Sequence, residues 1–212
     1  MKYILLTGFE PFDGEPINPS WELARALHGA QIDGHEVVAV RLPCVFGESL
    51  DVMRGAIRRF NPEVAIALGQ AGGCTDFSVE RVAINIDDAR IPDNAGRAPI
   101  DTPVVPGAPA AHFSTLPIKA IVAGLRAQGY PASVSLSAGT FVCNHVFFGL
   151  QHELAGTGRR SGFIHIPYLP QQAAKHSGTA SLPLSYLIEG LRVAVALAAS
   201  AQETHQGEGQ LH

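Results

Sequence analysis

Two hydrophobic patterns alternate along the chain. Short segments in which almost every residue is apolar are typical of strands buried in a sheet, whereas apolar residues three or four positions apart are typical of helices that bury one face. The first pattern occurs at residues 3–7, 37–42, 64–68, 132–136 and 162–166, and the second at 19–27, 50–60, 117–128, 143–155 and 182–201. Because strands and helices alternate, the pattern predicts an α/β fold with a mainly parallel sheet.

Other local signals refine this prediction. Asn18 and Pro19 fit the N-cap and the first position of a helix. Residues 78–86 predict a further strand, with Glu80, Val82 and Ile84 on one face. The following residues, as far as 115, are rich in Pro, Gly and Ala and predict a long loop, which in a compact domain is usually functional or mobile.

The chain contains no internal repeat and no linker that would divide it. Its 212 residues are enough for one sizeable core. We therefore expect residues 1–201 to form a single domain. Residues 202–212 are polar and contain several Gln and His, so a disordered tail is expected there.

Composition narrows the class of protein. A hydrophobic content of 46% and a charged content of 16% are typical of a compact globular chain. The formal net charge of −4 argues against nucleic acid or an anionic membrane as the main partner. No apolar segment has membrane-spanning length, and the N-terminal one is too short for a signal peptide. Three widely spaced cysteines, Cys44, Cys74 and Cys143, indicate reduced thiols rather than disulfides. We expect a soluble cytoplasmic protein.

The candidate chemistry centres on Cys143. A turn at residues 138–140 leads into a predicted helix that opens near this cysteine. Unpaired N–H groups and the positive end of the helix dipole would lower the pKa of the thiol, and the same N–H groups could stabilise an oxyanion. The alternative is a buried cysteine that serves as a small hydrophobic residue.

A cysteine nucleophile requires a base and a group that orients the base. His165 ends an apolar strand and is a candidate base, although it could equally be a core histidine. Glu80 lies among apolar residues, where a carboxylate needs a partner, either that histidine or a structural pairing with Arg81 or Arg90. Arg90 itself could donate to an oxyanion or be a surface cation.

Metal and cofactor signals are weak. Asp87 and Asp88 have no His or Glu at supporting spacing, and His145 and His152 are too far apart for the usual zinc pair. The glycine-rich turn at 69–73 does not match a dinucleotide-binding motif and is more typical of close backbone approach to a ligand. No metal and no cofactor are predicted.

Six segments in order along the chain resemble the pyroglutamyl-peptidase I family of cysteine peptidases. They are TGFEPF at 7–12, NPS at 18–20, GQAGG at 69–73, ERVAIN at 80–85, SAGTFVCNH at 137–145 and FIHIPYLP at 163–170. The resemblance implies a cytosolic enzyme that removes N-terminal pyroglutamate from peptides, often a homotetramer. It also implies a three-layer α/β/α sandwich of the phosphorylase/hydrolase type.

The same resemblance assigns roles to residues of this chain. It implies a catalytic triad of Cys143, His165 and Glu80, and an oxyanion contact from Arg90. It further implies a lactam pocket with three phenylalanine walls and two polar contacts: Phe9, Phe12, Phe141, Gln70 and Asn18.

One position departs from the family pattern. Cys74 occupies a site where the family usually has Arg, which puts a local charge contact in doubt. The loop at 103–112 and the C-terminal tail have no role that the resemblance assigns. Two other function classes remain open: a binding protein that keeps the pocket without catalysis, and a redox sensor in which Cys44 or Cys74 resolves an oxidised Cys143.

Overall fold

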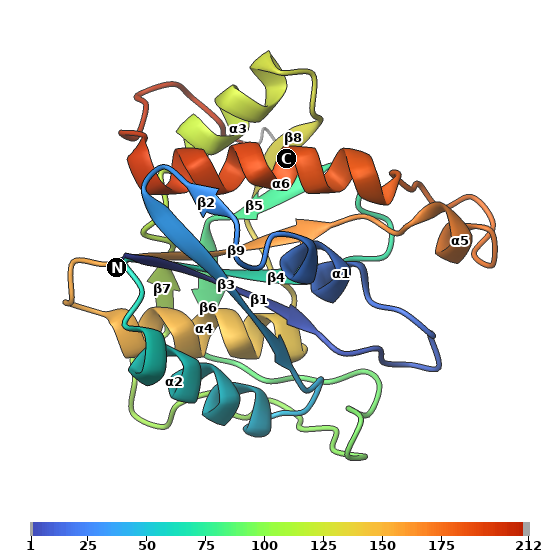
Figure 1. The fold of residues 1–212 in the computed structure, drawn as a ribbon. Helices are drawn as coiled ribbons and strands as arrows, with labels where there is room; N and C mark the ends of the chain where they lie inside the picture. The colour runs from blue at the N-terminus through green and yellow to red at the C-terminus, as the bar shows by residue number, and fades with distance from the viewer. Residues whose placement is uncertain (1, 210–212) are drawn as a thin grey trace.

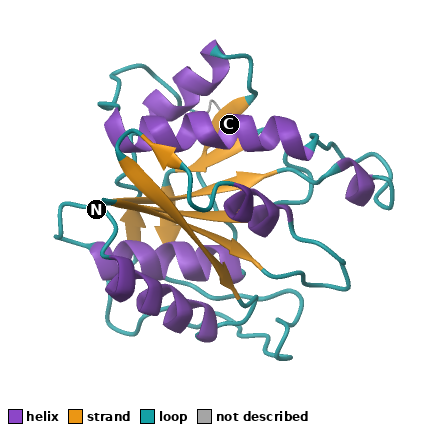
Figure 2. Cartoon of the chain, viewed as in Figure 1, coloured by secondary structure: helices purple, strands orange, loops and turns teal. Residues whose placement is uncertain are grey.

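The computed structural model describes residues 2–209. Within them, seven strands form one twisted sheet that lies between two layers of helices (Figures 1 and 2). In spatial order the strands are β2 (Gln31–Ile32), β3 (His35–Leu42), β1 (Tyr3–Phe9), β4 (Val64–Gln70), β9 (Arg160–Ile166), β5 (Phe77–Glu80) and β8 (Ala132–Ser135). The predicted α/β/α sandwich is therefore confirmed.

Each face of the sheet has its own apolar core. On one face pack α1 (Pro19–Ala26), α3 (Ile118–Ala127) and α6 (Leu184–Ser200), and on the other α2 (Glu48–Phe60) and α4 (Val142–Leu154). The four-residue helix α5 (Pro170–Ala173) lies in the connection after β9. Successive residues of the central strands contribute to opposite cores, which is why these strands read as continuous apolar segments.

The sheet is mainly parallel, with two exceptions. Strands β3, β1, β4 and β9 run in the same direction, so their carboxyl ends meet at one edge. β5 runs antiparallel to β9, with Ser78 opposite His165, and β2 runs antiparallel to β3. As a result, Glu80 of β5 lies beside the end of β9 although the two residues are far apart in sequence.

The prediction of one strand over residues 78–86 is wrong. The segment divides at Arg81 into β5, in the main sheet, and β6 (Val82–Ile84), which pairs with β7 (Ala111–Phe113) in a separate antiparallel ribbon. The division has a local reason, because Glu80 points inward to His165 while Ile84 must pair with Ala111. β7 also gives part of the predicted loop a regular structure.

The helix start at Asn18 is confirmed. The Asn18 side chain accepts a hydrogen bond from the backbone N–H of Ser20, and Pro19 occupies the first helical position.

Residues 202–209 contain no helix or strand, although the Glu203 carboxylate accepts hydrogen bonds from the backbone N–H groups of Lys119 and Ala120 at the start of α3. The predicted disordered tail stays a prediction, and its last three residues lie outside the described part of the chain.

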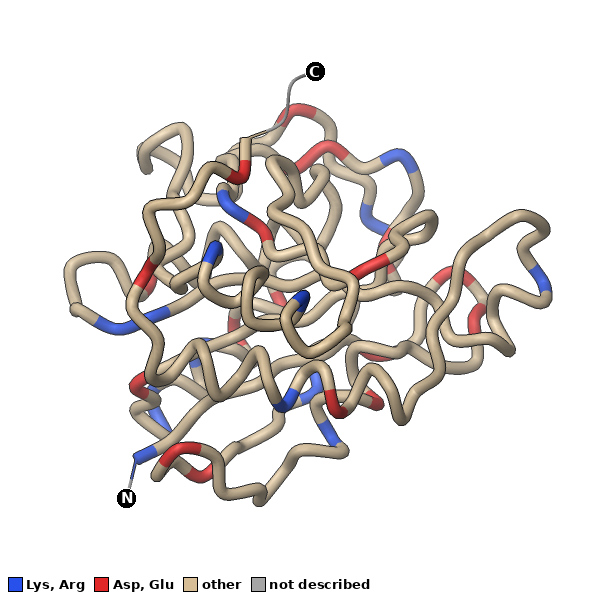
Figure 3. The backbone as a smooth tube through the Cα atoms, turned by 90° about the horizontal axis from the view of Figure 1, so that it is seen from above, with Lys and Arg blue, Asp and Glu red and all other residues tan. Residues whose placement is uncertain are grey.

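Charge on the surface is mixed. Lys and Arg are scattered among Asp and Glu around the backbone (Figure 3), which matches the small net charge. Among residues 2–209, none of the helices has the length and apolar character needed to cross a membrane.

Candidate active site

The thiol of Cys143 lies in the first turn of α4, over the backbone of Gly69. The N–H groups of this turn have no partner within the helix, and no side chain caps them. Gly69, at the carboxyl end of β4, makes room for the sulfur, since a Cβ there would lie only 2.8 Å from Sγ of Cys143. Gly69 is the register partner of His165 on β9. The thiol is therefore held next to the strand position that carries the candidate base.

The protonation of this thiol differs from the sequence-based expectation. Burial raises the pKa of Cys143 well above the usual value for a thiol, and the negative charge of Glu80 raises it further. The predicted lowering of the pKa by the helix terminus is thus outweighed. With its pKa raised in this way, the thiol of Cys143 would need a base to accept its proton before the sulfur could act as a nucleophile.

Glu80 and His165 form a buried hydrogen-bonded pair. Oε1 of Glu80 lies 2.7 Å from Nδ1 of His165, and the two residues are 1% and 7% exposed. With Nδ1 committed to the carboxylate, Nε2 is the nitrogen left for proton transfer. Among the described residues Glu80 has no ion pair with Arg81 or Arg90, so the structural alternative for this carboxylate is not observed.

One cavity of about 480 Å³ brings most of the predicted residues together. We call it the active-site cavity. The rings of Phe12 and Phe141, with centroids 6.1 Å apart, supply apolar wall. The lining consists of Phe12, Gln70, Gly72, Asp88, Arg90, Ile91, Ala138, Gly139, Thr140, Phe141, Cys143 and His165.

Two predicted pocket residues lie elsewhere. Phe9 is 2% exposed and packs in the core between the sheet and α2 and α4. Asn18 is the N-cap of α1, and its amide also donates to the carbonyl of Glu10. Neither lines the active-site cavity. Both instead fix the ends of the loop that carries Phe12.

Known proteins are similar to this chain over most of its length. The model of the pyroglutamyl peptidase family matches residues 2–201. The chain belongs to this family. It is 61% identical to a pyrrolidone-carboxylate peptidase of Cupriavidus pinatubonensis and 58% identical to one of Klebsiella pneumoniae, with all of each chain covered.

Solved structures of pyroglutamyl peptidases superpose closely on this chain. The crystal structure of pyroglutamyl peptidase I from Bacillus amyloliquefaciens is 44% identical, with a TM-score of 0.94 over 97% of this chain and 99% of that one. A mutant pyrrolidone carboxyl peptidase from Pyrococcus furiosus is 42% identical, with a TM-score of 0.89 over 92% of this chain and 97% of that one. This chain and the solved structures therefore have the same α/β fold over more than nine tenths of their length.

In this member of the family, two hydrogen bonds join the segment that carries Arg90 to the turn before α4. The hydroxyl of Thr140 donates to the carbonyl of Asp88 over 2.7 Å, and the N–H of Asp88 donates to the carbonyl of Thr140 over 2.9 Å. This reciprocal pair places Arg90, two residues further on, at the rim of the active-site cavity. Arg90 is exposed and makes no hydrogen bond or ion pair within residues 2–209, so its guanidinium is available to a ligand.

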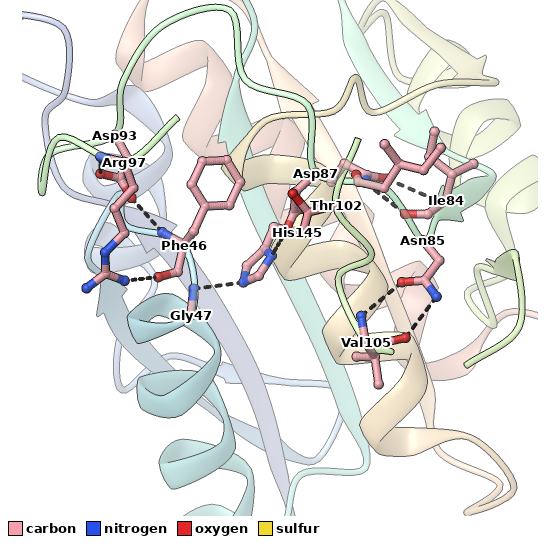
Figure 4. A network of polar contacts seen from close by, with 12 residues as sticks. Phe46, Gly47, Ile84, Asn85, Asp87, Asp93, Arg97, Thr102, Val105 and His145 are labelled. Atoms are coloured by element: carbon pink, nitrogen blue, oxygen red, sulfur yellow. Dashed lines mark hydrogen bonds and ion pairs between the residues drawn. The ribbon is translucent and has the colours of Figure 1, made fainter. Parts of the chain in front are cut away.

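A buried Asp87–His145 pair anchors the same segment on its other side (Figure 4). Nδ1 of His145 lies 2.8 Å from Oδ2 of Asp87, and Nε2 accepts the backbone N–H of Gly47 over 2.9 Å. Both ring nitrogens are therefore occupied. Like Glu80 and His165, this pair consists of a carboxylate and a histidine. Because both ring nitrogens of His145 are hydrogen-bonded, the pair holds the segment in place and has no nitrogen free to accept a proton.

Further contacts extend this anchor along the loop. The carboxylate of Asp93 accepts the N–H of Phe46, and Arg97 donates to the carbonyl of the same residue over 2.7 Å (Figure 4). Asn85 bonds to the backbone of Val105 with both ends of its amide. The long loop predicted from the sequence is thus held by hydrogen bonds at several points.

Sequence reasoning missed part of the cavity. Asp88 and Ile91 line it but lie outside every motif, and Thr140 lies within the segment at 137–145 but was not singled out. Asp87 was considered only as a metal ligand, and within the described residues no cluster suited to a metal ion is present. The only available signal was the spacing of acidic residues before Arg90, which does not reveal their partners on α4.

Proposed function

We propose that this chain is a cysteine exopeptidase that removes an N-terminal pyroglutamyl residue from peptides. The observation that carries the proposal is the shared cavity, in which Cys143 and the Glu80-bound His165 face a space walled by Phe12 and Phe141. Membership of the pyroglutamyl peptidase family supports the same activity.

The proposed reaction is acyl transfer through a thioester. Nε2 of His165 takes the proton of Cys143, and the sulfur attacks the pyroglutamyl carbonyl. The oxyanion is stabilised by the unpaired N–H of Cys143 and by Arg90. His165 then protonates the leaving amine, the C–N bond breaks, and water hydrolyses the thioester. Glu80 holds the imidazole in the tautomer that has Nε2 free and stabilises its cation.

Gln70 is suited to read the lactam ring. Its Oε1 accepts a hydrogen bond from the side chain of Gln172 over 2.9 Å. This bond fixes the orientation of the amide and leaves its NH₂ group to donate into the cavity. We propose that this group binds the lactam carbonyl while Phe12 and Phe141 enclose the ring.

The direct test is hydrolysis of pyroglutamyl-aminomethylcoumarin by the purified protein, with and without a thiol reductant. Turnover that depends on reduced Cys143 supports the peptidase. Binding without turnover would favour a binding protein. The redox-sensor alternative predicts instead a disulfide between Cys143 and a second cysteine in mild oxidant, whereas all three cysteines are free in the structure.

Glu80→Gln tests the role of the buried carboxylate. The change keeps the shape of the side chain but removes the charge that stabilises the imidazolium, so kcat should fall by roughly tenfold or more while KM changes less. Glu63→Gln is the matched control, since Glu63 also binds a histidine, His35, but at an exposed position far from the cavity. Full activity in Glu80→Gln would reduce Glu80 to a structural partner.

The resemblance also supports two finer proposals, a cytoplasmic location and a homotetramer. Two large apolar side chains, Ile100 and Phe113, are 74% and 69% exposed. Side chains of this kind are often covered at subunit interfaces. Sedimentation of the purified protein measures its mass in solution, and a monomer at micromolar concentration would contradict the tetramer.

A further inference from the structure

A second hollow adjoins the active-site cavity on the other side of His165. It has a volume of about 520 Å³ and shares Ala138, Gly139 and His165 with that cavity. It lies over β5 and β8, next to the part of the sheet that α4 covers. We call it the polar groove. The two hollows meet at the imidazole.

The polar groove differs in chemistry from the cavity walled by Phe12 and Phe141. Ser133 and Ser135 project into it from alternate positions of β8, while Ala132 and Val134 pack in the opposite core. Asp76 and Ser78 line its floor. These hydroxyl and carboxylate groups suit a peptide chain rather than an apolar ring.

The proposed reaction indicates which part of the substrate lies in the polar groove. A general acid has to lie within hydrogen-bond reach of the atom that it protonates. The leaving amine must therefore be next to His165, and the peptide attached to it must continue away from the pyroglutamyl ring. A third hollow, between Gly72 and Tyr168, is not lined by His165. The polar groove is the hollow that continues from the imidazole.

The polar groove is lined by negatively charged side chains, Asp76 and Glu80. Asp76 accepts a hydrogen bond from the hydroxyl of Ser78 over 2.8 Å and one from the thiol of Cys74, and it has no cationic partner within residues 2–209. No Lys or Arg lines the groove in the described chain. Burial raises the pKa of Cys74, so that side chain is neutral.

We propose that the polar groove binds the residue that follows pyroglutamate in the substrate, and that Asp76 makes it favour Lys or Arg over Asp or Glu at that position. This inference rests on the proposed peptidase activity. It adds a preference on the leaving-group side, which the lactam cavity cannot supply. The second carboxylate at the groove, Glu80, is 1% exposed and hydrogen-bonded to His165, so Asp76 is the carboxylate within reach of a substrate side chain.

The test compares three peptides that differ only in the residue X of pyroglutamyl-X-glycinamide, with X as Lys, Gln or Glu. At low ionic strength we expect kcat/KM for Lys to exceed that for Glu by roughly fivefold or more, with Gln between them. The Lys-to-Glu ratio should fall to within about twofold in Asp76→Asn, because the change removes the charge and keeps the size. Asp51→Asn, an exposed carboxylate of α2 outside both hollows, should keep the wild-type ratio.

Salt gives a second measurement that needs no variant. The wild-type ratio should shrink toward about one in roughly 1 M NaCl, where the Debye length is about 3 Å. Equal rates on the three peptides, a ratio that salt leaves unchanged, or an unchanged ratio in Asp76→Asn would overturn the inference. If pyroglutamyl-aminomethylcoumarin and all three peptides stay uncut, the peptidase proposal itself fails. Cleavage of all four without a charge preference removes only the role of the groove.

Discussion

Cys143→Ser should lower kcat/KM on pyroglutamyl-aminomethylcoumarin by about ten-thousandfold or more. The hydroxyl occupies nearly the same space over Gly69, so the fold and the cavity are expected to survive. It is a far weaker acid and nucleophile than the thiol, and the cavity already opposes ionisation at this position. In the proposed mechanism His165 deprotonates the thiol during attack, and the same transfer from a serine hydroxyl, with its much higher pKa, is expected to be far slower.

Cys44→Ala is the control for this loss. Cys44 is buried in the core on the α2 and α4 side, and burial raises its pKa to about 12, so it contributes no thiolate. It does not line the active-site cavity. We expect this variant to keep most of the activity with a small loss of thermal stability. Loss of turnover in a folded Cys44→Ala, with activity retained in Cys143→Ser, would show that the wrong cysteine had been assigned.

The second large effect concerns the substrate ring. Pyroglutamyl substrates should exceed prolyl and glutaminyl substrates in kcat/KM by roughly a thousandfold or more. Proline has a similar ring but lacks the lactam carbonyl and carries a charged amine, and an N-terminal glutamine lacks the closed ring. Without the carbonyl, the NH₂ group of Gln70 loses the partner proposed for it, while its Oε1 stays bonded to Gln172. The ammonium would have to lose its water between Phe12 and Phe141.

The structure changes one premise of this expectation. The sequence-based pocket contained no carboxylate, whereas the observed lining includes Asp88. Asp88 is exposed, however, and a solvated carboxylate offers little compensation to a cation. The comparison is kcat/KM on pyroglutamyl-, prolyl- and glutaminyl-aminomethylcoumarin under the same conditions. A prolyl rate within about tenfold of the pyroglutamyl rate would exclude a lactam-selective cavity, even with the triad intact.

The sequence by itself determined the fold class and the segments that carry the chemistry. Apolar strands alternating with amphipathic helices predicted an α/β fold with a mainly parallel sheet, because strands buried on both faces are apolar at nearly every position. The family resemblance added the three-layer sandwich. Asn18 and Pro19 predicted the start of α1 because capping is a local interaction. The motifs around Glu80, Cys143 and His165 indicated the family before any distance was known.

Only the tertiary structure decided how these segments meet. The break at Arg81 follows from two sheets that compete for neighbouring residues, and the 2.7 Å Glu80–His165 contact follows from the antiparallel register of β5 and β9. Asp87 and His145 had no predicted role, and the fold brings them together as a buried pair. The pKa of Cys143 is raised because burial, a property of the whole fold, outweighs the local helix terminus. The pairing of distant strands and the burial of a side chain both depend on the whole fold, so a local sequence pattern does not reveal them. The strand pairing brings the candidate catalytic residues to one cavity.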